Sequence, residues 1–170
     1  FDLQFGNLTQ FASTSGMQNG THMTKRYILT GMPGCGKTIL LRALELECYR
    51  VIEEAATDVI ALQQAQGITE PWQNPAFIDS VVTLQKQRQQ QAEELHETVQ
   101  FFDRSPVCTY ALCLFLGYPP SALLLQELDR LKHNKIYDQQ VFFVENLGTI
   151  HNTEARRISF ADALRFETIH

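Results

Sequence analysis

Residues 31–38 of the chain read Gly31-Met32-Pro33-Gly34-Cys35-Gly36-Lys37-Thr38. This stretch satisfies the pattern G-x-x-x-x-G-K-[ST] at every specified position. Glycines let the backbone turn tightly and bring several N–H groups to an anion without a Cβ in the way. The pattern therefore predicts a phosphate-binding loop, in which Lys37 reaches the β and γ phosphates of a nucleoside triphosphate and the Thr38 hydroxyl ligates Mg²⁺.

The sequence on either side of the loop has the context that this pattern requires. Residues 26–30 (RYILT) form a short β-rich run, and residues 38–48 have the apolar spacing of a helix. A helix that starts at the loop directs its N-terminal donors and positive dipole end at the same anion. A chance Gly-rich turn would also match the eight residues alone, but the strand–loop–helix order favours phosphate binding.

The rest of the chain alternates between short strands and helices. Further strands are predicted at 50–52, 100–102 and 140–144, and helices at 55–65, 77–96, 107–115, 121–132 and 159–169. This alternation predicts an α/β fold in which crossover units form a parallel sheet with helices on both faces. The strands are short and continuously apolar, as expected for strands buried on both faces.

The two ends of the chain differ from this regular part. Residues 1–22 are rich in Gly, Ser, Thr, Asn and Gln and have no clear period, so we interpret them as a flexible tail or a remnant of cloning. Residues 23–170, beginning at Met23, form the nucleotide-binding domain. The chain stops after a helix where such a sheet would add a strand, so we expect the last strand to be missing and the C-terminus to be truncated.

Composition excludes several classes of protein. At 170 residues the chain is long enough for one domain, and its net charge of −5 argues against nucleic-acid binding through bulk electrostatics. The longest apolar run, residues 110–116, is too short to span a bilayer. The four cysteines form no CxxC pair and no secretory signal precedes them, so we expect a cytoplasmic protein.

Charged residues follow two of the predicted strands. Asp103 and Arg104 come after residues 99–102, and a carboxylate at the carboxyl end of a parallel strand lies where ligands bind in open α/β sheets. We expect Asp103 to hold Mg²⁺ directly or through water, and Arg104 to grip a substrate oxygen or phosphate. The alternative is a helix-capping Asp beside a surface Arg.

Glu53 and Glu54 directly follow the strand at residues 50–52. Glu54 is a candidate base that accepts a proton from an attacking hydroxyl. The alternative is an acidic residue that favours the positive end of the next helix. Nearer the C-terminus, Arg156 and Arg157 are candidates to stabilise the charge on the γ-phosphoryl oxygens, or else a solvated pair at a helix start.

Other candidates have weaker support. Lys86 and Arg88 could line an acceptor pocket, but a solvated helix face is favoured, and Trp72 is expected to be a core residue rather than a base-stacking one. His96 and His133 lack metal-ligand spacing, so no zinc site is predicted.

The ordered segments GMPGCGKT, RVIEEAATDVI, FFDRS and NTEARRISF resemble NadR-like P-loop ATPase/kinase domains, which are often labelled AAA domains. They are also similar to deoxynucleoside kinases, and the resemblance spans about residues 25–170. It implies a five-stranded parallel sheet in the order 2-3-1-4-5 with helices on both sides. Thr57 departs from the pattern, since it stands where many of these relatives have an arginine.

The resemblance also implies roles for individual residues. It implies that Lys37 and Thr38 bind the nucleotide and magnesium, and that Glu54 is the base. It implies that Asp103 contacts magnesium or the acceptor and that Arg104 contacts the acceptor. It also implies a lid position for Arg156 and Arg157.

These features favour a phosphotransferase that moves the γ-phosphoryl of ATP or GTP to a small nucleoside-like acceptor. The identity of the acceptor, the choice of nucleotide and the oligomeric state stay open. A nucleotide-dependent switch or binding module that hydrolyses slowly is the second hypothesis. A ring-forming mechanical ATPase is disfavoured, because 170 residues leave no separate lid domain.

Overall fold

The computed structural model describes residues 24–31 and 35–144. The predicted tail at 1–22, the helix at 159–169 and any fifth strand therefore lie outside the described residues. The elements, in chain order, are β1 (Lys25–Gly31), α1 (Lys37–Leu46), β2 (Arg50–Ile52), α2 (Ala55–Ala65), the 3₁₀ helix η2 (Pro71–Gln73), α3 (Ala76–Glu93), β3 (Val99–Asp103), α4 (Pro106–Phe115), α5 (Ala122–His133) and β4 (Val141–Val144).

The described strands form one parallel sheet in the order β2-β3-β1-β4. The predicted α/β class and parallel sheet are confirmed, and this order corresponds to the first four places of the order 2-3-1-4-5. In the register, Leu29 of β1 lies beside Asp103 of β3, and Gly31 lies beside Val144 of β4. The carboxyl ends of neighbouring strands therefore meet at one edge of the sheet, which is where the charged residues gather.

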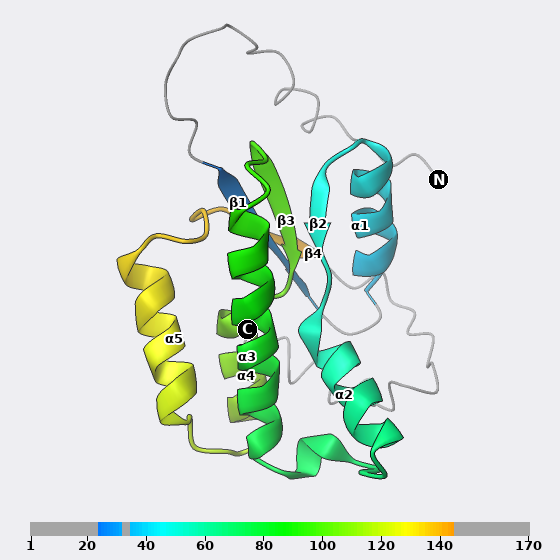
Figure 1. The fold of residues 1–170 in the computed structure, drawn as a ribbon, viewed down its shortest axis with the longest axis vertical. Coiled ribbons are helices and arrows are strands. Elements are labelled where there is room, and N and C mark those ends of the chain that lie inside the picture. Colours follow the sequence, from blue (N-terminus) through cyan, green and yellow to red (C-terminus); the bar gives the residue numbers. More distant parts are fainter. Residues whose placement is uncertain (1–23, 32–34, 145–170) are drawn as a thin grey trace, which may run out of the picture.

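Helices cover the sheet on both faces (Figure 1). One face packs against α1 through a cluster that includes Tyr27, Leu29, Leu41 and Phe101. Aromatic rings pack within this cluster, with the Tyr27 and Phe101 centroids 5.7 Å apart. The apolar side of α1 is thus fixed on the sheet directly behind the predicted phosphate loop.

A second core lies among the helices α2 to α5 on the other side. Its fully buried members include Val81 and Val82 of α3, Cys113 of α4 and Leu124 of α5. Trp72 packs against this cluster, in agreement with its expected core role.

Several element ends differ from the sequence-based prediction by a few residues. Helix α3 ends at Glu93 rather than at 96, because His96 has a φ of 52° that a right-handed helix does not allow. Helix α1 ends at Leu46 rather than at 48 for the same reason, since Cys48 has a φ of 64°. Strand β1 continues through Gly31 because β4 pairs with it there.

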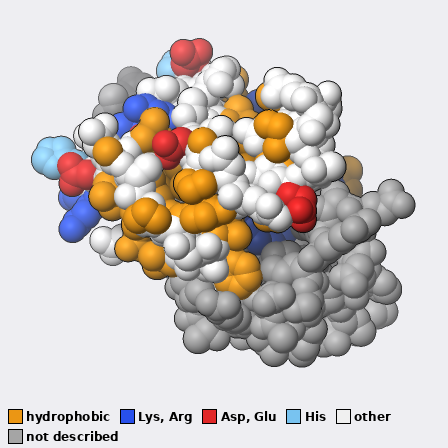
Figure 2. Space-filling view, turned by 90° about the horizontal axis from the view of Figure 1, so that it is seen from below, with side chains coloured by type: hydrophobic (Ala, Val, Ile, Leu, Met, Phe, Trp, Pro, Cys, Tyr) orange, Lys and Arg blue, Asp and Glu red, His pale blue; other side chains and the backbone are white. Residues whose placement is uncertain are grey.

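Large hydrophobic side chains are not all buried. Figure 2 shows hydrophobic side chains gathered on the face seen from below. On α4 and α5, Leu114, Leu123 and Leu125 are exposed although their neighbours are buried. In the described part of the chain, no helix is long and apolar enough to cross a membrane.

Leu124 and Leu125 are adjacent in α5 and have the same side chain, but only Leu124 is buried, so the pair tests the effect of burial on stability. We expect Leu124→Ala to lower the free energy of unfolding by about 2–5 kcal/mol, because this fully buried side chain leaves a cavity among the helices. The matched variant Leu125→Ala removes a half-exposed side chain, and we expect a change within about 0.5 kcal/mol. Urea denaturation measures both. Equal losses would show that the second core is not packed as described.

Candidate phosphate-binding site

The described parts of the phosphate loop have the conformation that its glycines permit. Gly31 has a φ of 135°, and a Cβ there would lie 2.4 Å from the carbonyl oxygen of Val144. Gly36 has a φ of 93° and precedes α1 as its N-cap. Both positions therefore need glycine or favour it strongly. Met32, Pro33 and Gly34 of the predicted loop lie outside the described residues.

Lys37 is the first residue of α1, and its side chain is almost completely buried. Its Nζ donates to the Gly31 carbonyl oxygen at 3.3 Å and lies 3.8 Å from Cys35 Sγ. Burial lowers the pKa of Lys37 below its ordinary value, and the nearby Arg104 charge lowers it further. The ammonium group is thus held inside the bend that the loop would wrap around a phosphate.

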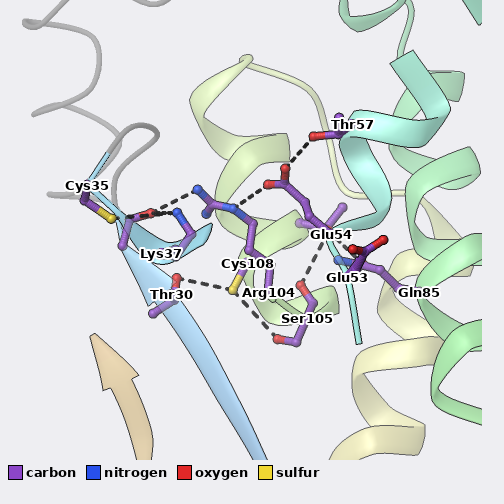
Figure 3. Close-up of polar contacts among 12 residues, drawn as sticks. Thr30, Cys35, Lys37, Glu53, Glu54, Thr57, Gln85, Arg104, Ser105 and Cys108 are labelled. Atoms are coloured by element: carbon purple, nitrogen blue, oxygen red, sulfur yellow. Dashed lines mark hydrogen bonds and ion pairs between the residues drawn. The ribbon is translucent and has the colours of Figure 1, made fainter. Parts of the chain in front are cut away.

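Arg104 points into the site and not into solvent. It follows β3 with a left-handed φ of 69°, and its backbone N–H donates to the Leu29 carbonyl. Its Nε donates to Glu54 Oε1 at 2.8 Å, and its Nη2 donates to the Gly31 carbonyl at 2.9 Å (Figure 3). Burial is the largest influence and by itself would lower the pKa of Arg104, but nearby negative groups, Glu54 first among them, together outweigh it and the pKa is raised. The alternative of a surface arginine is wrong.

Glu54 is held by two donors. Oε1 accepts from Arg104, and Oε2 accepts from the Thr57 hydroxyl at 2.6 Å. Glu54 is the N-cap residue of α2, yet its side chain makes no capping hydrogen bond. The carboxylate is therefore directed toward Arg104 and the loop, and it does not satisfy the start of its own helix.

Asp103 is buried at the end of β3, beside Leu29 of β1. The N-cap of the following helix is Ser105, not Asp103. The helix-capping alternative for Asp103 is therefore wrong. This carboxylate lies at the carboxyl edge of the sheet, as the sequence predicted.

A pocket of about 190 Å³ brings three of the predicted residues together. Thr38, Glu54 and Asp103 all line it, from three different elements. A hydroxyl and a carboxylate are ligands that Mg²⁺ accepts, and Mg²⁺ commonly takes one or two carboxylates with phosphates and water completing its shell. No group of three or more His, Cys, Asp or Glu side chains within the described ranges could hold a metal ion. The oxygen atoms of Thr38 and Asp103 are donors of the type that Mg²⁺ accepts beside phosphate and water.

Comparison with known families agrees with this geometry. A family model described as AAA domain matches residues 26–170, which is most of the chain. The chain belongs to this AAA domain family. The match supports a P-loop NTPase domain, and the parallel sheet with helices on both sides is consistent with that fold. It also indicates nucleotide binding. A search of curated proteins gave no match to the chain.

The AAA domain contains site contacts that the sequence did not reveal. Arg88 was expected on a solvated helix face, but its guanidinium contacts the backbone of Glu53 and Glu54, so that expectation is wrong. Lys86, on the same helix, lies 3.7 Å from the buried Glu127 and does not line the pocket. Arg156 and Arg157 lie outside the described residues.

The lowered pKa of Lys37 predicts proton-linked nucleotide binding. A polyphosphate favours the charged ammonium, whereas the empty site begins to lose that proton at a pH below the ordinary value of 10.5. We therefore expect nucleotide affinity to fall as the pH rises through this lowered pKa, with proton uptake on binding in the same range. Calorimetry at pH 7 to 10 in two buffers of different ionisation enthalpy measures both.

The variant Lys37→Arg is the control for this effect. A guanidinium keeps its charge throughout the range, so its affinity, although weaker, is expected not to vary with pH. Wild-type binding without proton uptake at any pH between 7 and 10 would contradict the described environment of Lys37.

Proposed function

We propose that this AAA domain is a P-loop phosphotransferase that moves the γ-phosphoryl of ATP or GTP to a hydroxyl of a small nucleoside-like acceptor. The observation that carries the proposal is the position of Glu54. Its carboxylate lines the same pocket as Thr38 and Asp103 and is held by two donors. A carboxylate fixed beside the phosphate end of the nucleotide is what a proton acceptor for an attacking hydroxyl requires.

The reaction follows from these positions. The acceptor oxygen attacks the γ phosphorus, the bond from that phosphorus to the β–γ bridging oxygen breaks, and the hydroxyl proton passes to Glu54. Lys37 neutralises charge on the β and γ oxygens, so catalysis rests on positioning and charge stabilisation. Thr38 and Asp103 would hold Mg²⁺, which when bound supplies positive charge to the phosphate oxygens. Arg156 and Arg157 are proposed as the lid arginines.

The lining of the pocket supports an acceptor without a phosphate group. Four carboxylates line it, from Glu53, Glu54, Asp58 and Asp103. Its one arginine in the described residues is Arg42, which is already paired with Glu45 and Glu53 at 2.7 and 2.6 Å. Arginines pair with three of these carboxylates and offset part of their charge, but four carboxylates against three arginines leave the lining acidic, which disfavours an anionic acceptor more than a neutral or cationic one.

A nucleotide-dependent switch with slow hydrolysis is the second candidate. The Gly31 carbonyl accepts from both Lys37 and Arg104, so loss of the Lys37 contact on nucleotide binding would be transmitted to the Arg104–Glu54 pair. Such a link between the loop and the Glu54 region is what a switch would use.

Removing the proposed base separates these two functions. With labelled ATP or GTP and a panel of nucleosides, we expect acceptor-dependent product from the wild type. We expect Glu54→Gln to lower its kcat by about 10²–10⁴-fold while nucleotide affinity is unchanged. Asp103→Asn should also lower kcat and should raise the Mg²⁺ concentration required. Glu47→Gln, which alters an exposed carboxylate on the far end of α1, is the control. Hydrolysis that no acceptor stimulates would contradict the phosphotransferase and favour the switch.

The effect of acceptor charge is tested by comparing a nucleoside with its 3′-monophosphate. Both compounds keep a free 5′-hydroxyl as a possible acceptor, and they differ in charge. We expect kcat/KM to be at least about tenfold lower for a nucleoside 3′-monophosphate than for the nucleoside, a difference of about 1.4 kcal/mol. Because salt screens exposed charges, the difference should narrow as ionic strength rises. Equal rates, or a difference that salt leaves unchanged, would contradict a charge-based choice of acceptor.

A further inference from the structure

Arg88, in the middle of α3, binds the chain where β2 passes into α2. Its Nη1 donates to the carbonyl oxygens of both Glu53 and Glu54, each at 2.9 Å. Its Nη2 pairs with the carboxylate of Asp58 in the first turn of α2. One guanidinium therefore holds three residues that are 30 to 35 positions away in sequence.

The other side-chain hydrogen bonds to Glu53 and Glu54 reach their carboxylates, whereas Arg88 reaches their backbone. β2 has only three residues and lies at the edge of the described sheet. Glu54 ends this segment with extended backbone angles, and no side chain caps the start of α2. A short edge strand that leads into an uncapped helix is a part of a fold expected to open easily. Arg88 supplies the cross-link that the local sequence does not.

We propose that Arg88 is a positioning residue for Glu54, and this inference rests on the proposed phosphotransferase. Arg104 and Thr57 hold the carboxylate end of Glu54, whereas Arg88 holds its backbone. With both ends fixed, the carboxylate keeps one place relative to the pocket. Positioning of this kind matters because an error of about 1 Å in a reacting group can lower a rate about 100-fold.

The neighbouring Arg42 shows why the Arg88 contacts are different. Arg42 also lies near the end of β2 and pairs with Glu53, but through the Glu53 carboxylate, and its side chain is 57% exposed. Exposed ion pairs of this kind contribute little. Arg88 is 22% exposed, and its planar fork bridges backbone and side chain, because Nη1 donates to two consecutive carbonyls while Nη2 pairs with Asp58. Because Arg42 itself lines the pocket, the matched control of the same charge is Arg50, an exposed arginine of β2 outside that lining.

Kinetics of variants test the proposal. We expect Arg88→Met to lower kcat by about 10–100-fold with the KM for nucleotide within about twofold of wild type. Arg88→Lys should retain part of the rate, because one ammonium can still donate to a carbonyl. Arg50→Met, at an exposed arginine of β2 that does not line this pocket, should stay within about twofold of wild type. Assays run well below the melting temperature of each variant, so that every variant is folded when measured.

A double-variant cycle separates positioning from a general structural role. If Arg88 acts through Glu54, Arg88→Met should lower the residual rate of Glu54→Gln by less than about twofold, because contacts that act as a unit are not additive. An equal loss in both backgrounds, or an unchanged kcat in Arg88→Met, would overturn the proposal.

A second measurement does not depend on transfer to an acceptor. Amide hydrogen exchange at residues 53–58 should be faster in Arg88→Met and unchanged in Arg50→Met. If the wild type transfers no phosphoryl group, the proposed function fails. Hydrogen exchange then still tests whether Arg88 holds the backbone at Glu54. Faster exchange only in Arg88→Met would support its hold on the Glu54 backbone, and unchanged exchange would overturn it.

Discussion

The carbonyl oxygen of Gly31 accepts hydrogen bonds from two cationic side chains, Lys37 Nζ at 3.3 Å and Arg104 Nη2 at 2.9 Å. Gly31 is the last residue of β1 and pairs with Val144 of β4, so this acceptor is fixed by the sheet itself. This one carbonyl oxygen therefore connects Lys37 of the phosphate loop to Arg104, which follows β3. Arg104 in turn connects it to Glu54. A Cβ at Gly31 would meet the Val144 carbonyl at 2.4 Å, so the arrangement depends on a glycine there.

Charge balance around this point explains why the site suits a polyphosphate. Two cations, Lys37 and Arg104, face two carboxylates, Glu54 and Asp103, and all four side chains are largely buried. Buried charges are costly unless they are compensated. Arg104 is well compensated, since its pKa is raised, whereas the pKa of Lys37 is lowered by its burial. The ammonium of Lys37 is thus the charge that gains most from an arriving anion, at the start of a helix whose dipole favours the same anion.

The sequence predicted which residues lie at this site better than it predicted the contacts that their side chains make. Parallel strands end at one edge of a sheet, so residues directly after β2 and β3 could be placed near the loop, and Glu54 and Asp103 do line one pocket with Thr38. The pairing of Arg104 with Glu54 and with the Gly31 carbonyl was not predictable, because it depends on a left-handed φ of 69° that an arginine rarely adopts. The contacts of Arg88 were missed because its partners are 30 or more residues away and are mainly backbone atoms, which leave no pattern in side-chain types.

Thr57 connects these contacts to the choice of acceptor. It stands where an arginine was expected from the resemblance to NadR-like domains, and its short hydroxyl donates to Glu54 Oε2. An arginine at this position would place a cation at the wall of the pocket and would attract a negatively charged acceptor oxygen. A threonine orients Glu54 equally well but adds no charge, so the carboxylates that line the pocket keep their effect. A single neutral residue thus fixes the candidate base and, in our proposal, leaves the pocket negative enough to disfavour a phosphorylated acceptor.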